Sequence, residues 1–298
     1  LADVSDTLPV MIAGGFVILG VALKAALFPM HAWMPNAYQH APTPVAIFFA
    51  ACATKVALFV MLRVQYELLL PNLGPQAAFL TSWLIPLCVG GFLVGSAVAM
   101  FERDLKRMLG YSSVAQLGYI VLGISLANSA GVTAAMIHFF NHALIKVALF
   151  VAVAGMVLRF GSSNIEQLAG VGKRMPWTTL GFMLAGVSLI GVPLTAGFIS
   201  KWYLIQAVLE LGGLGILLTI LILVSSLMAV VYIWKVVEVA YFKEPVDGQS
   251  MVGVREAPMP LLVVLWVLVL ANVWFGIDPS IPIALAEQQA AGFFGGAR

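Results

Sequence analysis

Residues 213–242 read GLGILLTILILVSSLMAVVYIWKVVEVAYF, a run of thirty residues in which only Lys235 and Glu238 carry charge. A helix crosses the hydrocarbon core of a bilayer with about 20 mostly apolar residues, so this run predicts a transmembrane helix. Seven further runs share its character, and the expected spans are 9–33, 43–64, 78–101, 109–127, 132–158, 177–211, 213–242 and 259–277. These runs are continuous and about twice as long as the ~10-residue strands of a membrane barrel. The sequence therefore predicts an all-α membrane protein, a polytopic bundle of about eight transmembrane helices.

The composition leads to the same class. Of the 298 residues, 62% are hydrophobic and 9% are charged, whereas soluble domains carry about 25% charged residues. A chain this apolar cannot cover its surface with polar groups, which excludes soluble enzymes and nucleic-acid-binding proteins. The formal net charge of +2 is too small to indicate an acidic partner.

No cofactor is expected. Cys52 and Cys88 lie inside apolar runs at no metal, haem or iron–sulfur spacing, so both are expected to be small buried residues. Gly170 and Gly172 follow no predicted strand and therefore form no dinucleotide-binding fingerprint. We expect that this chain binds no NADH, flavin or metal and performs no covalent catalysis.

The distribution of basic residues predicts how the bundle is oriented. Residues 1–298 are expected to form a single transmembrane domain, because no linker or soluble domain separates the spans. Eight basic residues lie in the loops 102–107, 159–176 and 243–258, whereas the other side receives only Arg63 and Arg298. The positive-inside rule places those three loops in the cytoplasm and both termini outside, most simply in a bacterial or archaeal plasma membrane. The chain begins at Leu1 rather than Met, and we expect its N-terminal half to be missing.

Four lysines, namely Lys24, Lys55, Lys146 and Lys201, lie deep inside the expected spans. A charged lysine at the bilayer centre costs about 2.5–3.5 kcal/mol, so four of them require a reason. They could form ion pairs that only hold helices together, or they could relay ions or protons. Every one is lysine and none is arginine, and a buried lysine can release its proton whereas arginine stays protonated. The choice of residue favours the relay.

Carboxylates are missing at the depth of these lysines. All 13 Asp and Glu residues fall in loops, tails or helix ends. Either the lysines are neutral for part of a cycle, or their counter-charges come from the missing N-terminal part or from a neighbouring subunit.

His138, His142 and Lys146 are spaced i, i+4 and i+8, so one helix would present them as a single stripe, with Asn141 close to it. A lone histidine in an apolar helix is usually a satisfied core residue. Two at this spacing that end on a lysine favour proton transfer, because histidine gains and loses a proton near neutral pH. His31 and His40 are expected to be solvated loop residues.

Two spans contain helix breakers beside a lysine. Pro29 follows Lys24, and the segment from Pro193 to Gly197 interrupts the span that contains Lys201. Broken membrane helices are tolerated where they line a protein or water cavity. We expect Lys24 to face the carbonyl end of a half-helix, and Lys201 to lie in the first turn of one, where the helix dipole disfavours its charge.

Four long motifs identify a family resemblance. They are LKAALFPMHAWMPNAYQHAPTPV (23–45), RDLKRMLGYSSVAQLGY (103–119), HFFNHALIKVALF (138–150) and GVPLTAGFISKWYL (191–204). With them the sequence resembles the antiporter-like membrane subunits that Mrp-type Na⁺/H⁺ antiporters share with respiratory complex I. The resemblance implies 14 helices in two inverted repeats. On that plan 1–64 ends the first repeat, 78–242 is the second repeat and 259–277 is the final helix.

The same resemblance implies roles for individual residues. Lys24 matches the lysine of the first broken helix, whose glutamate partner lies on an earlier helix, and Lys55 matches the connecting lysine. His138, His142 and Lys146 match the central hydrophilic axis, and Lys201 matches the terminal lysine of the second broken helix. The implied function is proton translocation, with other membrane subunits, protons, Na⁺ and lipid as partners, and no nucleic acid.

The resemblance leaves the family branch open. Some complex I subunits carry glutamate at the position of Lys201, and the antiporter A-type pattern has histidine where this chain has Ala50. The combination of Lys55 and Lys201 is most similar to the D-type subunit of Na⁺/H⁺ antiporters. The alternative is a proton-pumping subunit of an NADH:quinone oxidoreductase or a related hydrogenase complex, and a third interpretation is a purely structural membrane scaffold.

Overall fold

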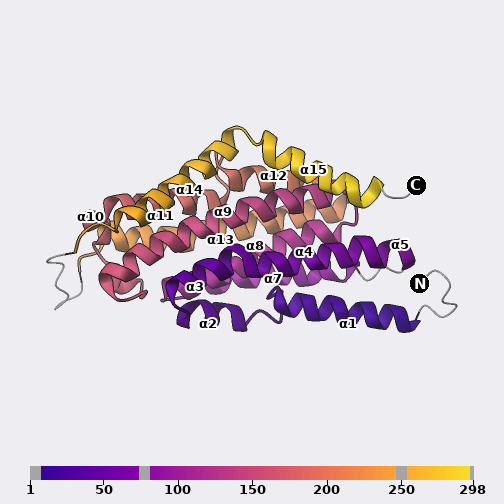
Figure 1. Cartoon of the computed structure of the whole chain (residues 1–298), viewed down its shortest axis with the longest axis horizontal. Coiled ribbons are helices and arrows are strands. Elements are labelled where there is room, and N and C mark those ends of the chain that lie inside the picture. The colour runs from indigo at the N-terminus through magenta and orange to yellow at the C-terminus, as the bar shows by residue number, and fades with distance from the viewer. Residues whose placement is uncertain (1–7, 74–80, 246–253, 296–298) are drawn as a thin grey trace.

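The computed structural model of the chain describes residues 8–73, 81–245 and 254–295. Within these ranges the fold is helical, and the one β-type pairing is an isolated bridge between Asp104 and Asn164. The long helices lie roughly along the longest axis of the molecule (Figure 1). The all-α bundle predicted from the sequence is therefore confirmed.

The described helices fall into three groups along the chain. The first contains α1 (Leu8–Lys24), α2 (Trp33–His40) and a continuous helical stretch made of α3 (Thr43–Phe48), η1 (Phe49–Ala53), α4 (Thr54–Arg63), η2 (Val64–Leu69) and α5 (Leu70–Leu73). The second contains α7 (Leu84–Phe101), α8 (Leu105–Ser125), α9 (Ser129–Phe160), η3 (Glu166–Leu168) and α10 (Val171–Arg174). The third contains α11 (Pro176–Ile190), α12 (Ala196–Leu209), α13 (Gly213–Phe242), α14 (Met259–Ile277) and α15 (Ser280–Gly295).

The predicted spans agree with these helices to different degrees. Two of them, 213–242 and 259–277, coincide with α13 and α14. The span 43–64 continues as helix to Leu73, and the first residues of 78–101 lie outside the described ranges. Helix α15 was not predicted, because its sequence contains Glu287 and two glutamines and is shorter than a membrane span. Six described helices are long and apolar enough to cross a bilayer, while α1 and α11 are shorter, so the predicted count of about eight is not confirmed.

Both predicted helix breaks are present. In the first, α1 stops at Lys24, Ala26 has a left-handed φ of 56°, and regular α-helix resumes at Trp33. In the second, α11 stops at Ile190, and the chain passes through Gly191 with φ 89° before α12 starts. Proline cannot supply the backbone N–H that a continuing helix requires, so each break follows from its sequence.

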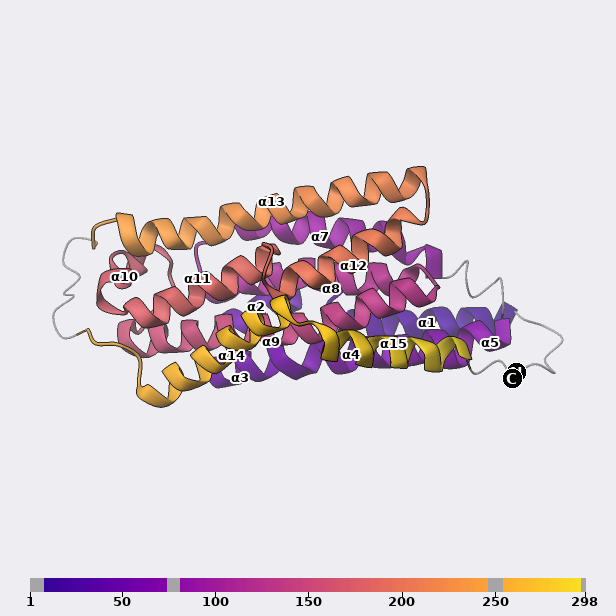
Figure 2. The same cartoon turned by 90° about the horizontal axis from the view of Figure 1, so that it is seen from above.

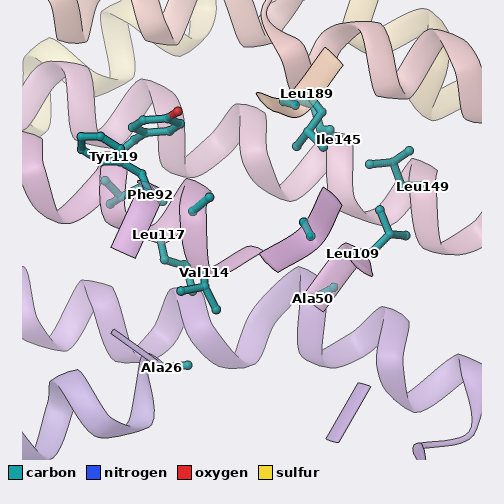
Figure 3. Packing of buried hydrophobic residues seen from close by; sticks show 14 of the residues in the cluster. Ala26, Ala50, Phe92, Leu109, Val114, Leu117, Tyr119, Ile145, Leu149 and Leu189 are labelled. Atoms are coloured by element: carbon teal, nitrogen blue, oxygen red, sulfur yellow. The ribbon is translucent and has the colours of Figure 1, made fainter. Parts of the chain in front are cut away.

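Helix α8 forms the centre of the bundle. Of its apolar window 94% is buried, and Figure 3 shows Val114 and Leu117 of this helix among the buried side chains of its neighbours. Helix α7 lies against it at close range. A Cβ added at Gly95 would be 2.9 Å from the backbone of Ala115, and one at Gly118 would be 2.9 Å from the carbonyl oxygen of Cys88. Small residues thus allow the two backbones to approach, as in other membrane helix pairs.

The two cysteines differ in environment. Cys88 is buried as expected, but Cys52 is exposed on the outer face of η1, so the prediction that both are buried is wrong for Cys52. Periodicity alone does not distinguish the two faces of an apolar helix that is hydrophobic all round.

The three basic loops lie together at one end of the bundle. Leu105 N–H donates to the Ser163 carbonyl at 2.8 Å, and Ile165 N–H donates to the Arg103 carbonyl at 2.8 Å. Arg159 Nε donates to the carbonyl of Glu256 at 3.0 Å, which joins the third loop to the second. The start of α1 and the end of α15 lie at the opposite end (Figures 1 and 2). The basic loop residues are therefore concentrated at one end of the folded bundle.

Candidate functional site: a buried lysine and histidine line

Lys201 links the two halves of the second broken helix. It lies in the second turn of α12 and is 5% exposed. Its ammonium donates to the last carbonyls of α11, at 2.7 Å to Ile190 and 3.2 Å to Leu189, and to Ser226 Oγ at 2.9 Å. The C-terminal end of a helix is its negative pole and stabilises a cation. The expectation that the dipole disfavours the charge of Lys201 is therefore wrong, because the side chain reaches across the break to α11.

The break is held in place by packing against α14. Leu194 adopts a left-handed φ of 69°, and its carbonyl oxygen would lie 2.4 Å from a Cβ at Gly276. Ser188 Oγ donates to Asn272 Oδ1 at 3.0 Å, which adds a polar contact between α11 and α14. The absence of a side chain at Gly276 lets α14 approach the backbone of Leu194 and Thr195 closely, while the Leu194 side chain stays exposed.

The predicted stripe on α9 is buried and faces the break. His138 and His142 are each 1% exposed, and their rings stack with centroids 6.1 Å apart and an interplanar angle of 4°. His138 Nδ1 shares a hydrogen bond of 2.8 Å with Ser200 Oγ, on the residue next to Lys201. His138 Nε2 and both ring nitrogens of His142 have no partner among the described residues. Buried polar atoms of this kind normally bind ordered water.

Two further buried lysines lie on the other side of the histidines. Lys146 is 0% exposed and donates to the carbonyl of Leu109 at 2.8 Å and to Ser112 Oγ. Lys55 is 4% exposed and donates to the carbonyl of Ala50. Lys55 and Lys146 are both within electrostatic range of His142. The structure thus gathers Lys55, Lys146 and the histidines into one buried neighbourhood.

The position of Lys55 depends on a π-helical segment. Residues Phe49–Ala53 form η1, directly before the helix that carries Lys55. A π-helical turn is wider than an α-helical one and is frequent at functional sites. Here the Ala50 carbonyl, five residues before Lys55, accepts from the ammonium. No pattern in the sequence predicted this segment.

Tyr119 lies between His138 and Lys201 and was not predicted as a site residue. Its ring meets the His138 ring edge-on at 5.7 Å, and Lys201 Nζ lies 5.3 Å from its centroid. Its hydroxyl donates to Ser225 Oγ at 2.7 Å, and the ring stacks on Phe92, as Figure 3 shows. A tyrosine in an apolar helix is an ordinary core residue in sequence, so only the fold reveals this position.

The buried lysines have no carboxylate partner among the described residues. The two ion pairs within these ranges are Arg63–Glu67 and Arg107–Glu102, both at the ends of the bundle. In the same ranges no group of three or more His, Cys, Asp or Glu side chains could hold a metal ion. The ammonium groups of Lys55, Lys146 and Lys201 instead contact carbonyl and hydroxyl oxygens.

Lys24 is set apart from the buried residues. It is the last residue of α1 and lies exposed on the outside of the described chain. The structure therefore brings together five of the six residues predicted for proton transfer and leaves Lys24 outside that group. The loop histidines differ slightly from the expectation, since His40 is exposed but His31 is half-buried and stacks on Phe28.

Relatives of this chain are subunits of respiratory complexes. It is 40% identical over 263 residues to NADH-quinone oxidoreductase subunit N of Desulforudis audaxviator (strain MP104C), covering 87% of this chain and 50% of that protein. In a solved structure of an archaeal respiratory complex, the membrane-bound sulfane sulfur reductase, one chain matches at 31% identity with a TM-score of 0.86, covering 97% of this chain and 57% of that one.

A chain of the Mrp complex from Dietzia sp. DQ12-45-1b has the same fold. Its TM-score is 0.88 at 23% identity, and the match covers 98% of this chain and 61% of that one. The chain spans about half the length of the curated relative described above. The family model described as "NADH:quinone oxidoreductase/Mrp antiporter, TM" matches residues 3–229, most of the chain. The chain therefore belongs to the NADH:quinone oxidoreductase/Mrp antiporter transmembrane family.

Proposed function

We propose that this chain is part of a proton-translocating membrane subunit of a redox-driven complex of the NADH:quinone oxidoreductase type. The observation that carries the proposal is the set of three buried lysines whose described hydrogen-bond acceptors are all neutral oxygen atoms. Because no ion pair has to break, such a lysine can gain and lose a proton within one cycle. Arginine in the same places could not.

In this proposal protons move from residue to residue through the buried neighbourhood. Lys55 and Lys146 exchange protons with His142, and His142 with the stacked His138. The Ser200 hydroxyl, bonded to His138, and Lys201 beside it continue the line. Water molecules at the unpaired histidine nitrogens would complete the hydrogen-bonded connections, as ordered water does at other buried polar groups.

Lys24 is proposed to be the pathway lysine of the first repeat. In this proposal residues 1–64 form the end of the first repeat, and residues 78–242 form the second repeat. Its exposed position on α1 fits a counter-charge that comes from another segment or subunit. Pro29, Pro193 and Gly197 are proposed to have the structural role of opening the two helices near Lys24 and Lys201.

The relatives favour the redox-driven interpretation over the antiporter interpretation. The relative that is 40% identical is named as subunit N of an NADH-quinone oxidoreductase, and the 31% identical chain belongs to a respiratory complex. The likeness to the Mrp complex is one of fold. Sodium–proton exchange as a D-type antiporter subunit, inferred from Lys55 and Lys201, remains the second candidate and predicts Na⁺-dependent proton flux.

The first experiment identifies the partners. The tagged full-length protein is purified from its native membranes in mild detergent, and co-purifying subunits are identified by mass spectrometry. The proposal requires subunits that carry iron–sulfur clusters or flavin. Recovery of small hydrophobic subunits alone would overturn the redox-driven interpretation and favour the antiporter.

The second experiment tests the buried line, that is, the side chains of Lys55, Lys146, His142, His138 and Lys201. Lys201→Ala in the assembled complex is expected to lower proton translocation at least tenfold while the complex still assembles. Lys173→Ala, at an exposed position of the short helix α10, is the matched control and should leave translocation unchanged. Unchanged proton translocation in the Lys201→Ala complex would instead support the interpretation that the chain is a purely structural membrane scaffold.

The orientation is part of the proposal. With the basic loops 102–107, 159–176 and 243–258 in the cytoplasm, the end of the bundle with α15 faces outward.

A further inference from the structure

The hydrogen bonds of the Lys201 ammonium involve two different kinds of acceptor. Two are the carbonyl oxygens of Ile190 and Leu189 at the end of α11, at 2.7 Å and 3.2 Å, and the third is Ser226 Oγ at 2.9 Å. Ser226 lies in α13, which packs against both α11 and α12 (Figure 2). An ammonium group has three N–H donors, so each of them has one acceptor here. The protonated lysine is thus fully hydrogen-bonded without a carboxylate.

The three acceptors differ in what they can do once the lysine is neutral. A neutral amine keeps two N–H donors and gains a lone pair, which needs a donor. A backbone carbonyl only accepts, so Ile190 and Leu189 can still bind the two N–H groups but cannot bind the lone pair. A serine hydroxyl both donates and accepts, and its hydrogen rotates freely about the Cβ–Oγ bond. Of these three acceptors, Ser226 is therefore the one that can bind the lone pair.

The surroundings of Lys201 make a partner for that lone pair necessary. The side chain is 5% exposed, and a buried polar atom that loses its partner is destabilising. Two titratable side chains face it from neighbouring helices, namely Tyr119 of α8, whose ring centroid lies 5.3 Å from Nζ, and His138 of α9, which is within electrostatic range. The sequences of α11 and α14 contain no titratable side chain. The hydroxyl of Ser226 is thus the neighbour in direct contact that can respond to a change of charge on Lys201.

A second buried lysine has the same combination of acceptors. Lys146 donates to the carbonyl of Leu109 at 2.8 Å and to the hydroxyl of Ser112, both on α8. Ser112 in turn donates to the Leu109 carbonyl at 3.0 Å. The arrangement of a lysine, a carbonyl and a serine hydroxyl on a neighbouring helix therefore occurs twice in the site.

We propose that Ser226 is a positioning residue that keeps Lys201 bound to the end of α11 in both of its protonation states. When the ammonium loses a proton, one N–H bond breaks, its electron pair stays on Nζ, and the proton passes to the next acceptor of the buried line. The Ser226 hydroxyl then rotates and donates to that electron pair, and no covalent bond of Ser226 breaks. The two remaining N–H groups stay on Ile190 and Leu189. The inference deepens the proposed function and rests on it for the proton cycle of Lys201.

The first test measures stability and requires no proton pumping. Thermal unfolding of the full-length protein in its assembled complex is followed from about pH 5.5 to about pH 10, below the ordinary pKa of lysine. The variants are Ser226→Ala, Lys201→Met and the combination of the two. Thr219→Ala is the matched control, because Thr219 is also a half-buried hydroxyl residue of α13 but donates within its own helix, to the Gly215 carbonyl at 2.9 Å.

The expected result is a stability loss that depends on pH. A hydrogen bond from a charged group is stronger than one between neutral groups. Ser226→Ala should therefore lower the unfolding temperature more at the acidic end of the range, where Lys201 is protonated, than at the alkaline end. In the Lys201→Met background the same substitution should have an equal effect at both ends. Thr219→Ala should have an effect that does not vary with pH, and Ser226→Thr, which keeps the hydroxyl, should resemble the parent protein.

The second test measures proton translocation by the assembled complex as a function of pH. Ser226→Ala weakens the protonated form of Lys201 more than the neutral form. Half-maximal translocation should therefore move by about one unit toward lower pH, which corresponds to an about tenfold loss of proton affinity. Ser226→Thr should restore the profile, and Thr219→Ala should not shift it.

Three outcomes of the stability test overturn the inference. They are an equal effect of Ser226→Ala at both ends of the pH range, a pH-dependent effect that persists in Lys201→Met, or a Ser226→Thr variant that behaves as Ser226→Ala. If Ser226→Ala does not assemble, Ser226→Cys replaces it with the same expectations, because a thiol is only a weak hydrogen-bonding group. The expected stability results with an unmoved translocation profile would overturn the proposed function and leave the role of Ser226 in place.

Discussion

Gly197 is the position at which a single methyl group should disconnect the two halves of the second broken helix. It is the second residue of α12, and its backbone N–H donates to Ser188 Oγ at 3.3 Å. A Cβ at this position would lie 1.8 Å from the carbonyl oxygen of Ser188 in α11. The proposed perturbation is Gly197→Ala, which adds that atom and a better helix former.

The size of the effect follows from these distances. To restore a C···O contact of about 3.3 Å, α11 and α12 must separate by about 1.5 Å. That shift lengthens the 2.7 Å bond from Lys201 to Ile190 beyond hydrogen-bonding range, and it strains the 2.8 Å bond between Ser200 and His138. A bond to a charged group contributes about 1.5–3 kcal/mol and a neutral one about 0.5–1.5 kcal/mol. Losing about 2–4 kcal/mol lowers at least tenfold the population of molecules in which both hydrogen bonds, Lys201 to Ile190 and Ser200 to His138, are formed.

The assay compares proton translocation with electron transfer in membranes that contain the assembled complex. Gly197→Ala should lower translocation at least tenfold, with a stability loss of about 1–3 kcal/mol from overpacking. Gly213→Ala is the matched control, because a Cβ there meets nothing within 4 Å. It should change neither quantity measurably.

Unchanged coupling in an assembled Gly197→Ala complex would refute the reasoning, since the added atom cannot be accommodated without moving α12. Should the variant fail to assemble, Ser200→Ala removes the hydroxyl bonded to His138 without adding volume, and translocation should still fall.

Three smaller predictions concern stability and are measured by thermal unfolding in detergent. Ser225→Ala removes the acceptor that lies 2.7 Å from the Tyr119 hydroxyl and should cost about 1–3 kcal/mol, whereas Tyr119→Phe should cost only about 1 kcal/mol; equal losses would contradict this. Asp104 caps α8 through the Arg107 N–H and also binds Ser163 Oγ, so Asp104→Ala should cost about 1 kcal/mol and Asp104→Asn less. Burial raises the pKa of Glu102 above its ordinary value of 4.5, so the fold favours the protonated carboxyl. Its contribution is complete below that value and is lost as the pH rises through the folded-state pKa, and Glu102→Gln should flatten this part of the melting profile.

Local chemistry explains what could be predicted from the sequence. The break at Pro193 was predictable because proline lacks the N–H that a helix needs. The stripe of His138, His142 and Lys146 was predictable because the pitch of a helix fixes which residues share a face. Uninterrupted apolar runs such as 213–242 were predictable from the thickness of the bilayer.

What could not be predicted depends on neighbours far apart in sequence. Lys201 binds the end of α11 because the chain folds back at the break, and only the tertiary structure shows that direction. The exposure of Cys52 and Lys24 depends on which helix faces pack against others. The π-helical turn before Lys55 involves a small local energy difference that sequence patterns do not record.

The contact between Lys201 and Ile190 has a mechanical consequence. The Lys201 amine joins the two half-helices, and it binds the end of α11 more strongly while it carries its proton, because the positive charge interacts with the negative pole of that helix. By reciprocity, any force that slides α11 against α12 biases the protonation of Lys201, and protonation biases the sliding by the same free energy. The broken helix thus couples the relative position of α11 and α12 to the protonation state of Lys201. A conformational change elsewhere in the membrane could therefore change the proton affinity of Lys201 by moving these helices.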